Sequence, residues 1–169
     1  MSALRHEGGA SAAAAVEIRP ARRREARAIA LVHVQADRET YAPIFGAGFQ
    51  EVALERSLHR WETALAAGDV LLVAVDDGRI IGFGHATNDW MSALYLVATH
   101  LRRGTGSRLL AALRAELAAR GVGEVSFKAV AGNDRALAFY AAQGAREVGR
   151  RWQEEGDAGW EDVHFVLPI

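Results

Sequence analysis

Residues 94–120, LYLVATHLRRGTGSRLLAALRAELAAR, decide the fold class because they join an apolar run to a run of leucines through a basic loop with two glycines. The apolar run is typical of a buried strand. Leu109, Leu113 and Leu117 lie on one face of a helix, which we expect at 105–120. The stretch therefore predicts a strand, a loop and a helix in immediate succession.

The rest of the chain supplies further strands and helices around this unit. Asp76-Asp77-Gly78 is a strong turn signal between two apolar runs, so residues 69–86 predict a β-hairpin. Pro43 interrupts the helical pattern within ETYAPIFGAG, residues 39–48. Other strands are expected at 16–19, 93–98, 124–130, 146–153 and 161–167, and other helices at 22–36, 54–65 and 133–144. The predicted order is β-α-α-β-β-β-α-β-α-β-β, a mixed sheet with helices packed on it.

Composition and charge narrow the class of protein. Half of the 169 residues are hydrophobic and 24% are charged, as in one soluble domain, and the formal net charge of −1 does not favour a nucleic-acid partner. The chain has no cysteine, which excludes disulfides, thiolate metal sites and a cysteine nucleophile. This fits a reducing compartment, so we expect a cytoplasmic protein. No apolar run approaches the roughly 18 residues of a membrane helix.

The first 15 residues differ from the rest, because they are small, polar and low in complexity. They lack the continuous apolar stretch of a signal peptide. We therefore expect residues 1–15 to form a disordered tail and residues 16–169 to form a single domain.

The glycine loop before the helix at 105–120 is suited to an anion. A helix start leaves backbone N–H groups unpaired at the positive end of the helix dipole, and glycine lets a ligand approach the backbone closely. Gly104 and Gly106 supply that access, while Arg102, Arg103 and Arg108 add positive charge. The loop therefore predicts a phosphate or pyrophosphate site, the alternative being a strand-to-helix turn with solvated surface arginines.

Two common phosphate loops do not fit. A Walker loop needs Lys-Ser/Thr after its last glycine, whereas Gly106 is followed by Ser107 and Arg108. A dinucleotide-binding loop needs a third glycine where Leu109 stands. Both are disfavoured.

A second motif lies downstream, NDRALAFYAAQG at 133–144. Together with LRRGTG at 101–106 and EIRPA at 17–21, it makes the chain resemble the GCN5-related N-acetyltransferase (GNAT) superfamily over nearly all of 16–168. The resemblance implies the GNAT-type α/β acyl-CoA N-acyltransferase fold, a mixed, mostly antiparallel, twisted sheet with helices on both faces. It also implies a parallel contact between the strands at 93–98 and 124–130, splayed at one end to admit a cofactor.

The chain departs from the family pattern at two positions. Leu101 stands where the family has Gln or Arg at the head of the loop, and Ala145 stands where Phe usually follows Gly144. Leu101 removes a polar contact on the cofactor side, which puts the strength of cofactor binding in question.

The cofactor implied by the resemblance is acetyl-CoA. Its contacts are carried over to the strand end, the loop and the second motif, at Leu96, Val97, Ala98, Arg102, Arg103, Gly104, Thr105, Gly106, Ser107, Asn133 and Tyr140. A free amide near Leu96-Val97 would stabilise the oxyanion. Tyr140 stands at the position of the family's general acid. A phenol with a pKa of about 10 stays protonated at neutral pH, as this role requires. The alternatives are a packed aromatic at Tyr140 and a helix cap at Asn133.

The acceptor amine needs a base and a pocket. Asp89 and His85 are the candidate bases, whereas His33 shares a helical face with Ile29 and Ala36 and is expected at the edge of the core. Tyr41, Phe45 and Trp90 are the candidate substrate-binding aromatics, while Trp61 continues an apolar stripe and is expected to be buried.

The first functional hypothesis is an acetyl-CoA-dependent N-acetyltransferase that acts on a small molecule or a peptide N-terminus by direct transfer in a ternary complex, without a metal. The alternative is a non-catalytic acyl-CoA-binding regulatory module, and a third hypothesis, a nucleic-acid-binding protein using Arg102 and Arg103, is disfavoured by the charge. We expect no membrane partner. The resemblance also implies a homodimer through the C-terminal strands, with Trp152 or Trp160 in the contact.

Overall fold

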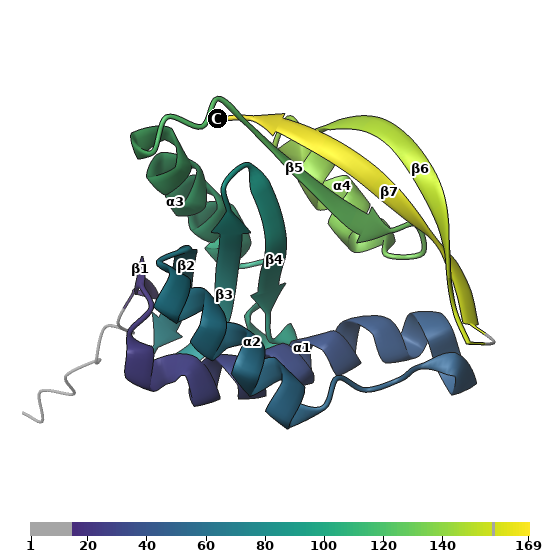
Figure 1. The fold of residues 1–169 in the computed structure, drawn as a ribbon, viewed down its shortest axis with the longest axis horizontal. Coiled ribbons are helices and arrows are strands. Elements are labelled where there is room, and N and C mark those ends of the chain that lie inside the picture. The colour runs from purple at the N-terminus through teal and green to yellow at the C-terminus, as the bar shows by residue number, and fades with distance from the viewer. Residues whose placement is uncertain (1–14, 157) are drawn as a thin grey trace, which may run out of the picture.

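The computed structural model describes residues 15–156 and 158–169, whose strands and helices follow the predicted order (Figure 1). The predicted tail therefore lies, apart from Ala15, outside the described residues. The strands are β1 (Glu17–Pro20), β2 (Val70–Asp76), β3 (Arg79–Thr87), β4 (Trp90–Leu96), β5 (Glu124–Val130), β6 (Arg146–Glu155) and β7 (Ala158–Pro168). The helices are α1 (Ala26–Phe45), α2 (Leu54–Ala67), α3 (Thr105–Ala119) and α4 (Asp134–Ala142), with short 3-10 turns η1 (Arg23–Glu25), η2 (Gly46–Gly48) and η3 (Ala98–His100).

The strands form a mixed, mostly antiparallel sheet in the order β1-β2-β3-β4-β5-β7-β6. β4 and β5 are parallel and pair at one position, Trp90 with Ser126. Beyond it the two strands diverge, which is visible as the opening between them in Figure 1. We call this interrupted junction between β4 and β5 the seam. The predicted parallel contact, splayed at one end, is confirmed.

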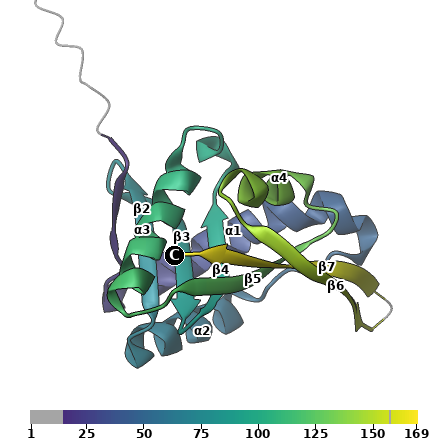
Figure 2. The same ribbon diagram turned by 90° about the horizontal axis from the view of Figure 1, so that it is seen from above.

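Helices cover both faces of the sheet (Figure 2). α1 and α2 pack on one face of β2, β3 and β4, around the fully buried side chains of Trp61 and Phe83. α3 and α4 pack on the other face, where Leu113 and Phe127 belong to a second core. The second core spans the seam, because it contains Met91 of β4 as well as Val125 of β5, whereas the first core lies against β2, β3 and β4.

The first helix is longer than predicted. The expectation that residues 39–48 break the helix is wrong, because α1 continues through Pro43 to Phe45 and ends at Gly46. Proline lacks the N–H that would bond the carbonyl of Glu39, but it lies within the last turn of α1, where few helical bonds remain to be lost. The extension carries the aromatic residues of this segment to the edge of the sheet.

The strand β4 begins earlier than predicted, at Trp90 instead of residue 93. It follows β3 through a tight turn in which Asn88 has a φ of 53°. The register shifts between His85 and Ala86, so that Ser92 is an additional residue in β4. Such a bulge disturbs the alternation of inward and outward side chains. The sequence pattern therefore did not indicate that residues 90–92 belong to the strand.

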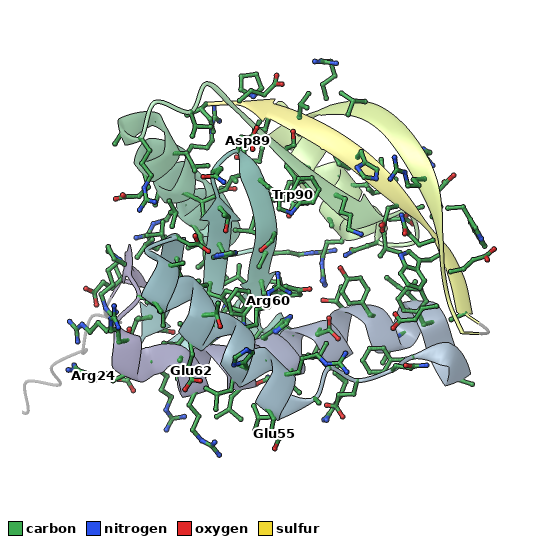
Figure 3. All side chains as sticks on the ribbon, in the orientation of Figure 1. Arg24, Glu55, Arg60, Glu62, Asp89 and Trp90 are labelled. Carbon is green, nitrogen blue, oxygen red and sulfur yellow. The ribbon has the colours of Figure 1, made fainter. Side chains whose placement is uncertain are left out.

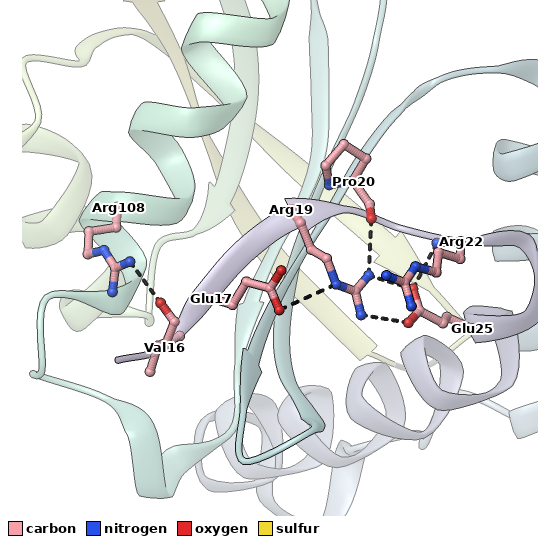
Figure 4. Close-up of polar contacts among 7 residues, drawn as sticks. All are labelled: Val16, Glu17, Arg19, Pro20, Arg22, Glu25 and Arg108. Carbon is pink, nitrogen blue, oxygen red and sulfur yellow. Dashed lines mark hydrogen bonds and ion pairs between the residues drawn. The ribbon is translucent and has the colours of Figure 1, made fainter. Parts of the chain in front are cut away.

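The first strand is held by two arginines (Figure 4). Arg19 donates hydrogen bonds of 2.7 and 2.9 Å to the carboxylate of Glu25, and this ion pair holds the pKa of Glu25 below its usual value. Arg108 of α3 donates to the carbonyl of Val16 at 2.8 Å. Arg108 therefore fastens β1 to α3. In the part of the chain that the structure describes, no helix has the length and apolar character needed to cross a membrane.

Candidate active site

A cavity of about 850 Å³ occupies the seam. Its walls come from α1, α2, β4, β5, α3, α4 and β7, so it runs from one face of the sheet to the other. Figure 3 places Trp90 beside the opening between β4 and β5, and Arg60 lower down, on the side of α1 and α2. We call the end near α3 and α4 the donor half and the end near α1 and α2 the acceptor half.

The donor half begins at the start of α3. Gly104 caps the helix with a φ of 77°, and Arg102 before it also has a positive φ of 59°. The first helical bond runs from the Arg108 N–H to the Gly104 carbonyl at 3.1 Å, so the N–H groups of residues 105–107 precede it without helical partners. A Cβ at Gly106 would meet Leu96 and Phe139 at 3.5 and 3.6 Å, which places this backbone at the cavity wall.

The edge of β4 supplies a further amide. The Val97 N–H donates to the Ile81 carbonyl of β3 at 2.9 Å. Because successive N–H groups of a strand point in opposite directions, the Leu96 N–H faces the seam, where β5 has diverged. The amide that follows Val97, that of Ala98, donates to the Glu39 carboxylate of α1 at 2.7 Å.

The structure brings most of the predicted cofactor residues to this half. Those that line the cavity are Leu96, Arg102, Gly104, Gly106, Ser107, Asn133 and Tyr140. Val97, Ala98, Arg103 and Thr105 do not line it, and Thr105 is 2% exposed. Leu101, the departure from the family pattern, is also part of the wall.

Tyr140 is both packed and placed in the cavity wall. Its ring lies 4.4 Å from that of Phe127 and 5.2 Å from that of Phe139. Burial raises the pKa of the Tyr140 hydroxyl above its ordinary value, so the phenol keeps its proton across the physiological range. Asn133 caps α4, since its side-chain oxygen accepts a hydrogen bond from the Ala136 N–H at 3.1 Å, and it lines the cavity as well.

The acceptor half is lined by aromatic rings. Tyr41, Phe45 and Trp90, the aromatic residues proposed from the sequence for the acceptor, all line the cavity. Phe45 lies 6.0 Å from Tyr41 and 5.9 Å from Trp160, ring to ring. Trp160, which the sequence analysis placed in a dimer contact, is therefore part of this wall.

The two candidate bases do not line the cavity. Asp89 lies in the turn between β3 and β4, at the end of β4 where the seam is closed, as Figure 3 shows. His85, on β3, is 6% exposed, and its ring nitrogens contact Ser92 and Asp69. His33 is buried against Trp61, as expected for a residue of the core, and burial lowers its pKa to about 4.

Sequence reasoning missed several polar residues of the acceptor half, among them Asp37, Arg60, Ser92 and Tyr95. Asp37 is 8% exposed, and burial raises its pKa to about 6, although the Tyr95 side chain partly opposes this shift. These residues come from α1, α2 and β4, and none belongs to a local motif. They meet only because α1 and α2 present these side chains toward β4 and because the bulge at Ser92 changes the direction of that side chain.

Comparisons with known proteins agree with this architecture. The sequence profile of the Acetyltransferase (GNAT) family matches residues 35–145. An N-acetyltransferase from Staphylococcus aureus Mu50 has 18% identity and a TM-score of 0.75, with 90% of this chain and 98% of that chain aligned. A ribosomal-protein-alanine N-acetyltransferase from Brucella melitensis has 22% identity and a TM-score of 0.74, over 90% and 99% of the two chains.

A third solved structure contains a ligand. It is yncA, a putative acetyltransferase from Salmonella typhimurium with its cofactor acetyl-CoA, and it has 18% identity and a TM-score of 0.73 over 90% of this chain and 93% of its own. Among curated proteins, no match was found. The neighbours establish the fold, and the profile match over most of the domain establishes that the chain belongs to the GNAT acetyltransferase family.

Proposed function

We propose that this protein is an acetyl-CoA-dependent N-acetyltransferase that transfers an acetyl group to the amine of a small molecule or a peptide N-terminus. The observation that carries the proposal is the continuity of the 850 Å³ cavity. It joins an anion-binding helix start, a free strand amide and Tyr140 to an aromatic acceptor half. Donor and acceptor can therefore meet inside the seam without leaving the protein.

The donor half fits acetyl-CoA. The unpaired N–H groups of residues 105–107, the open face of Gly106 and the Arg102 guanidinium offer contacts for its pyrophosphate. From this helix start the cavity continues between β4 and β5, along Leu94, Phe127 and Ala129, where the rest of the molecule would lie. The solved Salmonella relative with bound acetyl-CoA supports this assignment. When bound, acetyl-CoA supplies an acetyl thioester that is open to attack by an amine.

Two groups of this chain serve the transfer. The Leu96 N–H faces the seam and would donate to the carbonyl oxygen as that oxygen gains negative charge. The Tyr140 hydroxyl holds a proton that can pass to the departing sulfur, and it regains a proton from the new amide nitrogen. Because the chain has no cysteine, direct transfer in a ternary complex is the simplest mechanism.

The acceptor half favours an amine that carries an apolar or aromatic group. Tyr41, Phe45 and Trp90 provide flat apolar walls, and Asp37 provides a carboxylate at the same end of the cavity. A protonated amine would find in Asp37 a partner of opposite charge.

Calorimetry with acetyl-CoA, followed by a thiol-release assay, tests the proposal. The acceptor panel should include benzylamine, phenethylamine and a tripeptide amide with a free N-terminal alanine. Binding with turnover of at least one amine is expected. Binding without turnover of any amine would favour the alternative, a non-catalytic acyl-CoA-binding regulatory module, for which Leu101 in the cavity wall leaves room. No binding would overturn both.

A further inference from the structure

A chain of hydrogen bonds leads out of the acceptor half. The Ser92 Oγ, in the cavity wall, lies 2.6 Å from the His85 Nδ1. The His85 Nε2 lies 3.0 Å from the Asp69 Oδ2, which also accepts a hydrogen bond from the Thr87 hydroxyl at 2.8 Å. The bulge in β4 turns Ser92 toward His85, so the bulge creates the chain.

The partners fix where the protons lie. A carboxylate only accepts, so the Nε2 of neutral His85 carries the hydrogen that is donated to Asp69. The Nδ1 of His85 is then an acceptor, and Ser92 donates its hydroxyl proton to it. Arg60 donates to the Ser92 Oγ at 3.0 Å, which occupies one lone pair of that oxygen and leaves the other for the cavity.

Resting on the acetyltransferase function proposed above, we propose that Ser92, His85 and Asp69 form a proton relay that takes up the proton which the acceptor amine must lose. Ser92 is the member that meets the amine in the cavity. His85 is the proton acceptor, and Asp69 holds the imidazole in the required tautomer.

The step balances in protons. The ammonium of the acceptor gives one proton to the Ser92 Oγ, while the Ser92 hydroxyl proton passes to the His85 Nδ1. The amine becomes neutral, the serine is unchanged, and His85 becomes an imidazolium paired with the Asp69 carboxylate. The Asp69 side chain is 18% exposed and that of His85 is 7% exposed, so Asp69 gives the relay its contact with solvent.

The surroundings of His85 suit a base at neutral pH. Burial is the largest influence on its pKa and lowers it from the ordinary 6.5. The Arg60 charge, on α2, lowers the pKa further, whereas the Asp69 carboxylate, between α2 and β2, opposes both. His85 is therefore neutral at pH 7, ready to accept a proton, and its charged form has a partner when it arises.

The chain contains a matched pair that lacks these features. The His33 Nδ1 lies 2.8 Å from the Ser57 Oγ, deep between α1 and α2. Neither residue lines the cavity, and neither is bonded to a carboxylate among the described residues. Ser57→Ala is thus a control that removes a buried histidine–serine bond and leaves every hydrogen bond of the proposed relay in place.

The test is the pH dependence of kcat, measured on the best amine of the panel, for the wild type and for Ser92→Ala, Ser92→Thr and His85→Gln. In the wild type we expect kcat to fall at low pH, and the midpoint of this acidic limb should lie below the ordinary histidine pKa of 6.5. Ser92→Ala and His85→Gln should lower kcat at pH 7 by roughly 10²-fold. Their limb should move up toward the pKa of the amine itself, which is about 8 for a peptide N-terminus and about 10 for an alkylamine, so that activity recovers in alkali. Ser92→Thr keeps the hydroxyl, so its acidic limb should stay at the wild-type pH whatever the value of its kcat.

Ser57→Ala should lower the melting temperature but leave the limb in place, which separates the relay from mere loss of packing. An unchanged limb in Ser92→Ala, or a limb that is lost only in Asp37→Asn, would overturn the relay. Acetylated Ser92, detected by mass spectrometry after reaction, would overturn it too, because the serine would then be a nucleophile. Failure of the wild type on every amine would instead overturn the proposed function itself.

Discussion

Asp37 is a residue whose burial acts against stability. The residue is 8% exposed, and the pKa of its carboxyl group is raised from 3.8 to about 6, mainly by burial and further by the charge of Glu51. The folded state therefore disfavours the charged form that predominates at neutral pH. No ion pair among the described residues compensates it. A carboxylate that costs stability and lines the acceptor half is best explained by the amine that it would bind.

We therefore expect Asp37→Asn to stabilise the protein at pH 7.5, by about 3 kcal/mol at most. A folded pKa above the unfolded one means that the cost is present above pH 6, fades as pH falls through about 6, and is absent below 3.8. The difference in unfolding free energy between variant and wild type should vanish near pH 4. Urea unfolding at several pH values measures it. A variant less stable than the wild type at pH 7.5 would show that the contact of the carboxylate with Tyr95 outweighs the cost of its burial.

Tyr140 can be tested by removing its hydroxyl alone. Tyr140→Phe keeps the ring that packs on Phe127, so we expect an unchanged affinity for acetyl-CoA and a melting temperature near that of the wild type. The departing sulfur loses its proton donor, and kcat should fall by roughly 10²-fold. Calorimetry and steady-state kinetics on an amine for which chemistry limits the rate provide the measurement. Full kcat in this variant would assign Tyr140 a packing role only.

At the scale of the element, the start of α3 carries the proposed pyrophosphate site. Gly106→Val puts two methyl groups at a cavity wall where a Cβ would still be accommodated at 3.5 Å from Leu96. The fold should survive, because the backbone of Gly106 does not have a positive φ. Affinity for acetyl-CoA should fall at least tenfold, as seen by calorimetry.

Gly149→Val is the matched control for this substitution. It places the same side chain in β6, where a Cβ meets nothing within 4 Å. Binding should then equal that of the wild type. Equal affinities for the two variants would mean that phosphate groups bind elsewhere.

Helices and strands whose apolar residues recur at one regular spacing were predictable from the sequence, whereas those in which this spacing is interrupted were not. β5 has the predicted bounds, and α3 differs by one residue at its end, because their apolar residues follow an uninterrupted pattern. Pro43 in α1 and the bulge at Ser92 in β4 broke the pattern without ending the element. In both places tertiary packing outweighed a local signal.

The same distinction applies to the site. The donor half depends mainly on two segments, the loop before α3 and the segment 133–144, and within each of them the residues lie close together in sequence and form a recognisable motif. The acceptor half depends on single side chains such as Asp37, Arg60 and Trp160, which lie on three elements far apart in the chain. No spacing rule relates them. Only the packing of α1 and α2 across the sheet and the reach of β7 bring them into one cavity.

At the scale of the whole molecule, the cavity predicts a selective response to ligands. A ligand that binds only the folded state, at one hundred times its dissociation constant, adds about 2.7 kcal/mol to the free energy of unfolding. For a domain of this size that is roughly 5–10 °C in Tm. Acetyl-CoA should produce this shift in differential scanning fluorimetry, while ATP and NAD at equal concentration should produce much less. Equal shifts with all three would reveal a general anion site.

The C-terminal strands carry the remaining prediction, a homodimer. β6 is an edge strand, and its exposed Trp152 and Val148 are 60% and 50% accessible. An edge with exposed apolar side chains is a ready surface for a second copy. Light scattering should give twice the monomer mass at micromolar concentration, and Trp152→Ser should reduce it. A monomer at every concentration would remove the dimer from consideration.

The seam also has a mechanical meaning. β4 and β5 are joined at one end by the pairing of Trp90 with Ser126, and elsewhere no rung of the sheet connects the two strands. A sheet normally resists tension because its rungs share the load, whereas here a force that separates β1 from β7 falls on a single rung and on the side chains around it. Along the seam the two parts of the sheet are therefore held together mainly by side-chain packing, in the core that Met91 of β4 shares with Val125 of β5. A ligand bound in the seam would contact both β4 and β5 and so join the two parts of the sheet. The stiffness of the domain would then report whether the cavity is occupied.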